Sequence, residues 1–141
     1  MDIALVGAGI GGLAAAACLI QKGHRVRVYE QAAQVGEVGA AVQMSANAVK
    51  VLDELGLRAH LEAVSVKPKA FEFRRFDTGE LLHEIKLGAI HEQTHGAPYY
   101  QIHRVDLHAG LMDVVNRLDP AAVQLGVRAV GVDEAESHVA L

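Results

Sequence analysis

Three glycines near the start of the chain, spaced as Gly7-x-Gly9-x-x-Gly12, form a pattern that can hold a pyrophosphate. Gly7 permits a sharp turn after a strand, Gly9 leaves room for a phosphate to approach the backbone, and Gly12 allows close packing of a helix. A helix that begins at this turn directs free amide groups and the positive end of its dipole toward an anion. The pattern therefore predicts a dinucleotide site.

Glu30 is the second group with chemistry of its own. It ends the second predicted strand, which carries Val26 and Val28, and it follows Gly12 at the distance at which a carboxylate accepts hydrogen bonds from ribose hydroxyls. The glycines and Glu30 together predict a site for the ADP part of a dinucleotide, in which the glycines face the pyrophosphate and Glu30 faces the ribose.

These residues need a strand, a helix and a second strand to position them. The unbroken apolar run Ile3–Val6 predicts a strand buried on both faces. A helix with the small Ala16 on its packed face, a turn at Gly23 and a second strand ending at Glu30 complete a βαβ unit. The predicted fold class is α/β, with a Rossmann-like unit and an antiparallel hairpin insertion, and the fold is expected to be incomplete.

The rest of the chain predicts further elements. Gly36 and Gly39 mark a loop, and Ser45 or Asn47 caps a helix that ends at Gly56. The pattern over 71–87 predicts a hairpin, and 88–98 reads as a histidine-rich loop. We also expect a helix from Arg104 to Pro120 and strands at 99–102, 123–125, 127–132 and 139–141.

Composition excludes several classes of protein. The chain has 141 residues, 51% of them hydrophobic, and a net charge of −4, which argues against nucleic acid or an anionic membrane as the main partner. The apolar stretch 3–20 contains four glycines and lacks a positively charged start, so it is a poor membrane span or signal sequence. Cys18 is the only cysteine, which excludes an internal disulfide and fits a cytoplasmic protein.

Two later segments, taken with the glycine pattern, resemble single-component flavoprotein aromatic hydroxylases such as salicylate and 3-hydroxybenzoate hydroxylases. The first segment is 36–48, and the second is 99–108, which contains His103-Arg104-x-Asp106-Leu107. The resemblance runs along the whole chain in the family's order. One departure is Ala41, where many members of the family carry glycine.

The resemblance implies an FAD-dependent mono-oxygenase that uses NAD(P)H and O2 to hydroxylate an aromatic substrate with phenolic or carboxylate groups. It places residues 1–141 in the first part of an FAD-binding domain, with 66–103 contributing to a substrate-side β-sheet. It assigns cofactor contacts to Gly7, Gly9, Ile10, Gly11, Gly12, Glu30, Gln31, Val42, Gln43 and Arg104. Gln43, near flavin and substrate, is the one candidate catalytic residue. The family's later Gly-Asp segment is absent, so we expect the front portion of a longer protein, without turnover alone and of undetermined oligomeric state.

Two other functions are consistent with parts of the sequence. An NAD-binding Rossmann module without flavin would use Glu30 equally well, because the carboxylate contacts only the ribose, which both cofactors contain. His91-Glu92-x-x-His95 matches the motif of zinc hydrolases, in which two histidines bind the metal and the glutamate is the base. That motif lies between Gly88 and Pro98, which leaves about two helical turns at most, so we assign no metal ligand. An exposed surface arginine paired with Asp106 is the structural alternative for Arg104.

Overall fold

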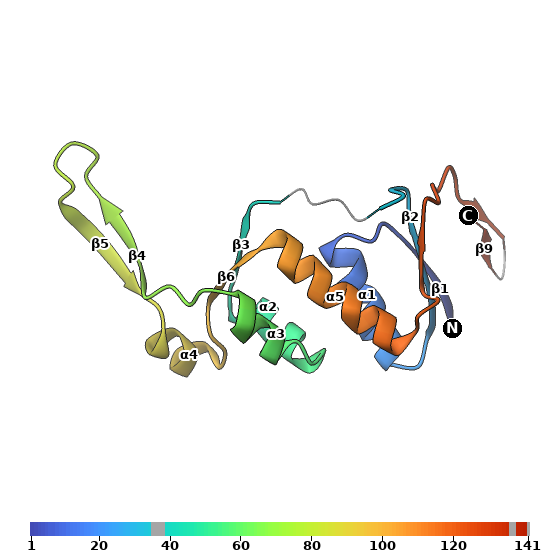
Figure 1. Ribbon diagram of the computed structural model, residues 1–141, viewed down its shortest axis with the longest axis horizontal. Coiled ribbons are helices and arrows are strands. Elements are labelled where there is room, and N and C mark those ends of the chain that lie inside the picture. Colours follow the sequence, from blue (N-terminus) through green and yellow to red (C-terminus); the bar gives the residue numbers. More distant parts are fainter. Residues whose placement is uncertain (35–38, 136–137, 141) are drawn as a thin grey trace. The chain divides into compact units, whose positions relative to one another are not determined.

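The computed structural model describes residues 1–34, 39–135 and 138–140, and these form two compact units. The first unit comprises 1–37 and 111–141, and the second comprises 38–110. Figure 1 labels most of the helices and strands. In chain order the elements are β1 (Asp2–Val6), α1 (Ile10–Gln21), β2 (Arg25–Glu30), β3 (Ala41–Met44), α2 (Ala46–Glu54), α3 (Arg58–Val64), β4 (Ala70–Arg74), β5 (Leu81–Lys86), α4 (Ala89–His95), β6 (Tyr100–His103), α5 (Arg104–Leu118), β7 (Val123–Leu125), β8 (Asp133–Glu134) and β9 (Val139–Ala140).

The first unit is built on a parallel sheet with the strand order β1-β2-β7. Helix α1 connects β1 to β2, which pair in register from Asp2 opposite Arg25 to Val6 opposite Tyr29. Leu13, Ala16 and Ala17 of α1 are buried, as are Val26 and Val28 of β2. The predicted βαβ unit of Rossmann type is therefore confirmed.

Strand β1 departs from its prediction in one respect. The apolar run was expected to be buried on both faces, but exposed and half-buried residues alternate along β1, and the Val6 side chain is 63% exposed. The reason is that β1 lies at an edge: among the described residues it pairs only with β2.

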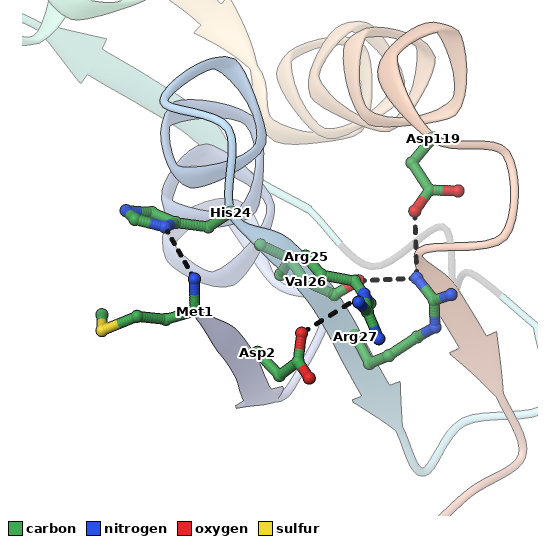
Figure 2. Close-up of polar contacts among 7 residues, drawn as sticks. All are labelled: Met1, Asp2, His24, Arg25, Val26, Arg27 and Asp119. Carbon is green, nitrogen blue, oxygen red and sulfur yellow. Dashed lines mark hydrogen bonds and ion pairs between the residues drawn. The ribbon is translucent and has the colours of Figure 1, made fainter.

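Arg27 links β2 to the turn before β7, as Figure 2 shows. Its Nη1 donates to the Val26 carbonyl and to Asp119 Oδ2, each at 2.9 Å. The N–H of Ala121 donates to the other Asp119 oxygen, and this bond, followed by the contacts with Arg27, holds the pKa of Asp119 below its usual value. The contacts fix the chain where β7 joins the parallel sheet.

The second unit contains α2, α3, α4, the first part of α5 and two antiparallel strand pairs, β3–β6 and β4–β5. The hairpin predicted at 71–87 is confirmed, with a register shift between Phe73 and Arg74. The helix predicted before Gly56 is also confirmed as α2, and Gly56 follows it with φ of +80°. Ser45 occupies the N-cap, but its hydroxyl donates to the side-chain oxygen of Asn47, so neither side chain caps the helix as predicted.

Three segments differ from the sequence prediction. Residues 88–98 were expected to form a loop, but Ala89–His95 forms α4, which ends at Gly96 in the left-handed conformation. No strand was predicted between the loop at Gly39 and the helix cap at Ser45, but Ala41–Met44 forms β3 because β6 supplies a pairing partner. The strand expected at 127–132 is wrong: no neighbour among the described residues continues the ladder past Val127, and Val130 is 91% exposed.

One helix was not predicted, and two predictions fall partly on residues that the structure does not describe. Helix α3 was not predicted, since it is short and Leu61 is its only buried residue. Residues 36–38 of the predicted loop and Leu141 of the predicted last strand lie outside the described residues. Among the helices that the structure describes, none combines the length and the apolar character required to cross a bilayer.

Candidate functional site

The glycine loop connects β1 to α1 and turns sharply at Gly7. Gly7 has φ of +97°, a conformation that glycine adopts readily, and its N–H donates to the Tyr29 carbonyl at 2.8 Å. A Cβ placed on Gly12 would lie 2.0 Å from the Gly7 carbonyl oxygen. The first turn of α1 therefore packs directly on the loop backbone, and only glycine at position 12 permits this contact.

Gly9 and Gly11 have the opposite environment. A Cβ built on either one would meet nothing within 4 Å, and both residues are exposed. Gly9 is the N-cap of α1, whose first amides have no acceptor within the helix. The loop thus offers open space directly in front of a helix N-terminus, which is the arrangement that favours an anion.

Glu30 lies at the carboxyl end of β2, beside this loop. Its Oε2 accepts a hydrogen bond from the Ala8 N–H, and its Oε1 accepts one from the Ala32 N–H, both at 2.8 Å. Gln31 follows and is exposed. The structure therefore brings together seven of the predicted site residues, namely Gly7, Gly9, Ile10, Gly11, Gly12, Glu30 and Gln31.

Ala8 is a site residue that sequence reasoning missed. Its amide joins the loop to the Glu30 carboxylate, and its side chain is 3% exposed. Because the contact is made by a backbone amide, the residue type at position 8 does not indicate this hydrogen bond. The glycines on both sides were the only indication in the sequence that backbone amides of this loop would form part of the site.

The other three predicted residues lie in the second unit. Val42 and Gln43 are in β3, opposite Ile102 and Gln101 of β6; Val42 is half-buried and Gln43 is exposed. Arg104 begins α5, and its N–H donates to the Ala40 carbonyl at 3.2 Å. Its side chain is exposed, and among the described residues it forms no ion pair with Asp106 or any other carboxylate.

Gly39 allows the segment before β3 to lie against the start of α5. A Cβ on Gly39 would lie 3.0 Å from the Arg104 Cβ. Any larger residue at position 39 would therefore displace Arg104 or the segment itself. Gly39 was predicted only to mark a loop, so its contact with Arg104 was not predicted from sequence.

The two histidines of the zinc motif lie on α4 beside aromatic residues. The ring centroids of His91 and His95 are 4.5 Å apart, and the Tyr99 ring meets His91 edge-on at 5.7 Å. Among the described residues, no group of three or more potential ligands surrounds them. Burial, and secondarily the charge of His95, lowers the pKa of His91, so the neutral imidazole is favoured in the folded protein.

This shift predicts a pH dependence of stability. The His91 pKa is lower in the folded chain than its ordinary value of 6.5, so the unfolded chain takes up the proton first as the pH falls. We expect this contribution to reduce the free energy of unfolding as the pH drops through and below about 6.5, and to vanish at higher pH. In His91→Gln, the free energy of unfolding measured by urea denaturation should lack this pH dependence.

His95→Asn provides the matched comparison. It removes the neighbouring charge but leaves the burial of His91, which is the larger cause of the shift. Part of the pH dependence should therefore persist in His95→Asn. If His91→Gln keeps the same pH dependence as the parent chain, the assignment to His91 is wrong.

Comparisons with known proteins find relatives that align with 99% of the chain. Residues 5–73 match the model of an NAD(P)-binding Rossmann-like domain. The chain is 43% identical over 139 residues to the 3-amino-4-hydroxybenzoate 2-monooxygenase of Streptomyces cremeus, covering 99% of the chain and 34% of that protein. It is 33% identical to the 3-hydroxybenzoate 6-hydroxylase of Polaromonas naphthalenivorans, covering 99% and 35%.

Solved structures give the same fold. The structure of Klebsiella pneumoniae HpxO complexed with FAD and uric acid superposes with a TM-score of 0.85 at 29% identity, covering 99% of this chain and 34% of that one. The chain thus spans about a third of the length of the curated relatives and the solved structure that it matches.

Proposed function

We infer that this chain, which is homologous to FAD-dependent aromatic mono-oxygenases over about a third of their length, binds FAD as part of such an enzyme. The observation that carries this inference is the glycine loop. Gly12 holds α1 against the loop backbone, while Gly9 and Gly11 leave the helix start open. This arrangement supports binding of the ADP half of FAD, with the pyrophosphate at the N-terminus of α1.

The residues of the glycine loop and Glu30 fit the ADP half of FAD. A side chain at Gly9 or Gly11 would occupy the open space that the pyrophosphate needs, and the chain has none there. The Glu30 carboxylate beside the loop is an acceptor of the type that ribose hydroxyls require. We assign the pyrophosphate contacts to Gly7, Gly9, Ile10, Gly11 and Gly12, and the ribose contact to Glu30, with Gln31 beside it.

The proposed activity of the whole enzyme is hydroxylation of an aromatic ring. Bound FAD supplies the redox chemistry for which NAD(P)H is the reductant and O2 the oxygen donor. The chain's own residues bind and orient the cofactor. The names of the relatives, which specify hydroxybenzoate and aminohydroxybenzoate substrates, support a phenolic, carboxylated ring as the substrate class.

The remaining assignments concern the second unit. We propose that Val42 and Gln43 lie near the flavin ring, and that 66–103 contributes to a substrate-side sheet. The exposed amide of Gln43 on β3 supports the first assignment, since it is available as donor and acceptor. The exposed face of the β4–β5 hairpin supports the second, because Phe73 is 53% exposed there.

Arg104 gives a test of its own. The guanidinium is exposed and forms no ion pair among the described residues, so Arg104→Ala should leave the thermal midpoint of the chain unchanged. If Arg104 contacts FAD, the same variant should weaken FAD binding by about 10-fold, as expected for loss of one hydrogen bond to a charged group. Fluorescence titration with FAD measures this, and Arg117→Ala, exposed in the last turn of α5, is the control. An unchanged affinity in Arg104→Ala would remove it from the site.

A nicotinamide module without flavin is the second candidate, favoured by the match to an NAD(P)-binding domain. Gel filtration of the folded chain after incubation with FAD, and separately with NAD, distinguishes the two. Retained flavin absorption supports our proposal. Retention of NAD together with exclusion of FAD would support the nicotinamide module instead.

A further inference from the structure

His60 joins α3 to the first two turns of α5 within the second unit. Its Nε2 lies 2.8 Å from the Asp106 carbonyl oxygen, and its side chain is half-buried. A carbonyl oxygen can only accept a hydrogen bond, so the Nε2 of His60 carries a proton and donates it. The imidazole therefore binds the backbone of α5 two residues after that helix begins at Arg104.

Gly110 provides the space for the imidazole. A Cβ built on Gly110 would lie 2.6 Å from the His60 Cδ2, 2.7 Å from the His60 Nε2 and 2.9 Å from the Leu57 Cδ2. Gly110 is buried within α5, and the glycines with positive φ among the described residues do not include it. The backbone conformation of position 110 thus does not require glycine, whereas the approach of His60 does. His60 and Gly110 form a matched pair.

Arg104 is the first residue of the helix that His60 contacts. Its N–H donates to the Ala40 carbonyl, and its Cβ would lie 3.0 Å from a Cβ built on Gly39. These contacts hold the backbone of Arg104, but its guanidinium is exposed and forms no ion pair among the described residues. Where the guanidinium lies therefore depends on where the start of α5 is held.

We propose that His60 is a positioning residue for FAD binding: its hydrogen bond to Asp106, which Gly110 makes possible, holds the start of α5 so that Arg104 meets the cofactor. This proposal rests on the proposed contact between Arg104 and FAD. In this role His60 acts through Arg104 and has no contact of its own with the cofactor. His60 and Arg104 should therefore contribute to FAD affinity as one unit.

A double-mutant cycle on FAD affinity tests this coupling. The dissociation constant is measured by flavin fluorescence for the parent chain, His60→Ala, Arg104→Ala and the double variant. His60→Ala alone should weaken binding by about 3- to 10-fold. In the Arg104→Ala background, the same substitution should cause no further loss. A role of His60 in stability alone would weaken binding by the same factor in both backgrounds.

Three other variants separate the hydrogen bond from general effects. His60→Gln keeps an N–H donor at about the same distance from the backbone, so its FAD affinity should be close to that of the parent chain. Gly110→Ala keeps His60 but displaces its ring, so it should weaken binding as much as His60→Ala does. Glu62→Ala, on the exposed side of α3, should leave FAD affinity unchanged.

The hydrogen bond itself can be observed without FAD. In an NMR spectrum of the nitrogen-15-labelled histidine rings, the Nε2–H of His60 should be protected from exchange with water in the parent chain. That protection should be lost in Gly110→Ala. If the His60 Nε2–H exchanges fast in the folded parent chain, the hydrogen bond does not persist in solution and the proposal is wrong.

The remaining outcomes distinguish this proposal from the proposed function. If Arg104→Ala weakens FAD binding but His60→Ala does not, or if His60→Ala has the same effect in both backgrounds, the positioning role is wrong and the FAD contact of Arg104 stands. If a folded parent chain does not bind FAD, or if Arg104→Ala leaves its affinity unchanged, the contact is wrong and the positioning role is overturned with it. Unfolding of both His60→Ala and Gly110→Ala would assign the pair to the fold and overturn the proposal.

Discussion

Replacing Gly12 with alanine should unfold much of the first unit or weaken it severely. The new Cβ would lie 2.0 Å from the Gly7 carbonyl oxygen and 3.1 Å from its carbon. Both are backbone atoms, so no side-chain rotation relieves the overlap, and either α1 or the loop must move. Overpacking of this kind typically costs 1–3 kcal/mol, and a backbone clash should cost about 3 kcal/mol or more. Urea unfolding monitored by circular dichroism measures this change.

Gly11→Ala is the matched control for stability, one residue away in the same helix. Its Cβ would meet nothing within 4 Å, and alanine has the higher helix propensity. The free energy of unfolding should stay the same or rise by up to about 1 kcal/mol. Equal destabilisation by Gly11→Ala and Gly12→Ala would show that loss of glycine itself, and not the close approach to Gly7, is responsible.

Replacing Glu30 with alanine should lower FAD affinity by about 10- to 100-fold. The carboxylate holds the amides of Ala8 and Ala32 at 2.8 Å and is the proposed acceptor for the ribose hydroxyls. Its removal would leave the loop amide without this acceptor and remove the ribose contact. The dissociation constant is measured by quenching of flavin fluorescence during titration of FAD with protein.

Two variants separate the local effect from a general one. Glu30→Gln keeps one oxygen acceptor but loses the charge, so its FAD affinity should fall between those of the parent chain and Glu30→Ala. Glu84→Ala removes a carboxylate from the exposed strand β5 and should leave FAD affinity unchanged. If Glu30→Ala remains folded and binds FAD as tightly as the parent chain, Glu30 is not part of the site.

The parts of the fold that sequence predicted correctly are those with a local cause. The positive φ of Gly7, the close approach at Gly12 and the end of β2 at Glu30 each follow from the residue type at that position. The hairpin of β4 and β5 likewise follows from alternation around a turn that contains Gly79. For these elements, neighbours along the chain determine the backbone.

The parts that sequence did not predict depend on distant partners. Strand β3 exists because β6 pairs with it from Ala41 opposite His103 to Met44 opposite Tyr100. The segment 127–132 has a similar apolar pattern, but it has no such partner among the described residues and is not a strand. Whether each of these segments forms a strand therefore depends on a pairing partner more than on its own composition.

The candidate site divides in the same way. The seven residues around the glycine loop could be placed together from sequence because one βαβ unit contains them all. Val42, Gln43 and Arg104 were assigned only through a family resemblance, and their contacts with β6 and Ala40 became visible in the structure. Their roles toward FAD stay predictions.

An NMR titration of the isotopically labelled chain with FAD, and then with ADP alone, tests the central claim most directly. If the glycine loop and Glu30 bind the ADP half, the amide signals of Gly7 to Gly12 and of Glu30 and Gln31 should shift with both ligands. The signals of Val42, Gln43 and Arg104 should shift with FAD only. A folded chain whose loop signals stay fixed with both ligands would contradict the account.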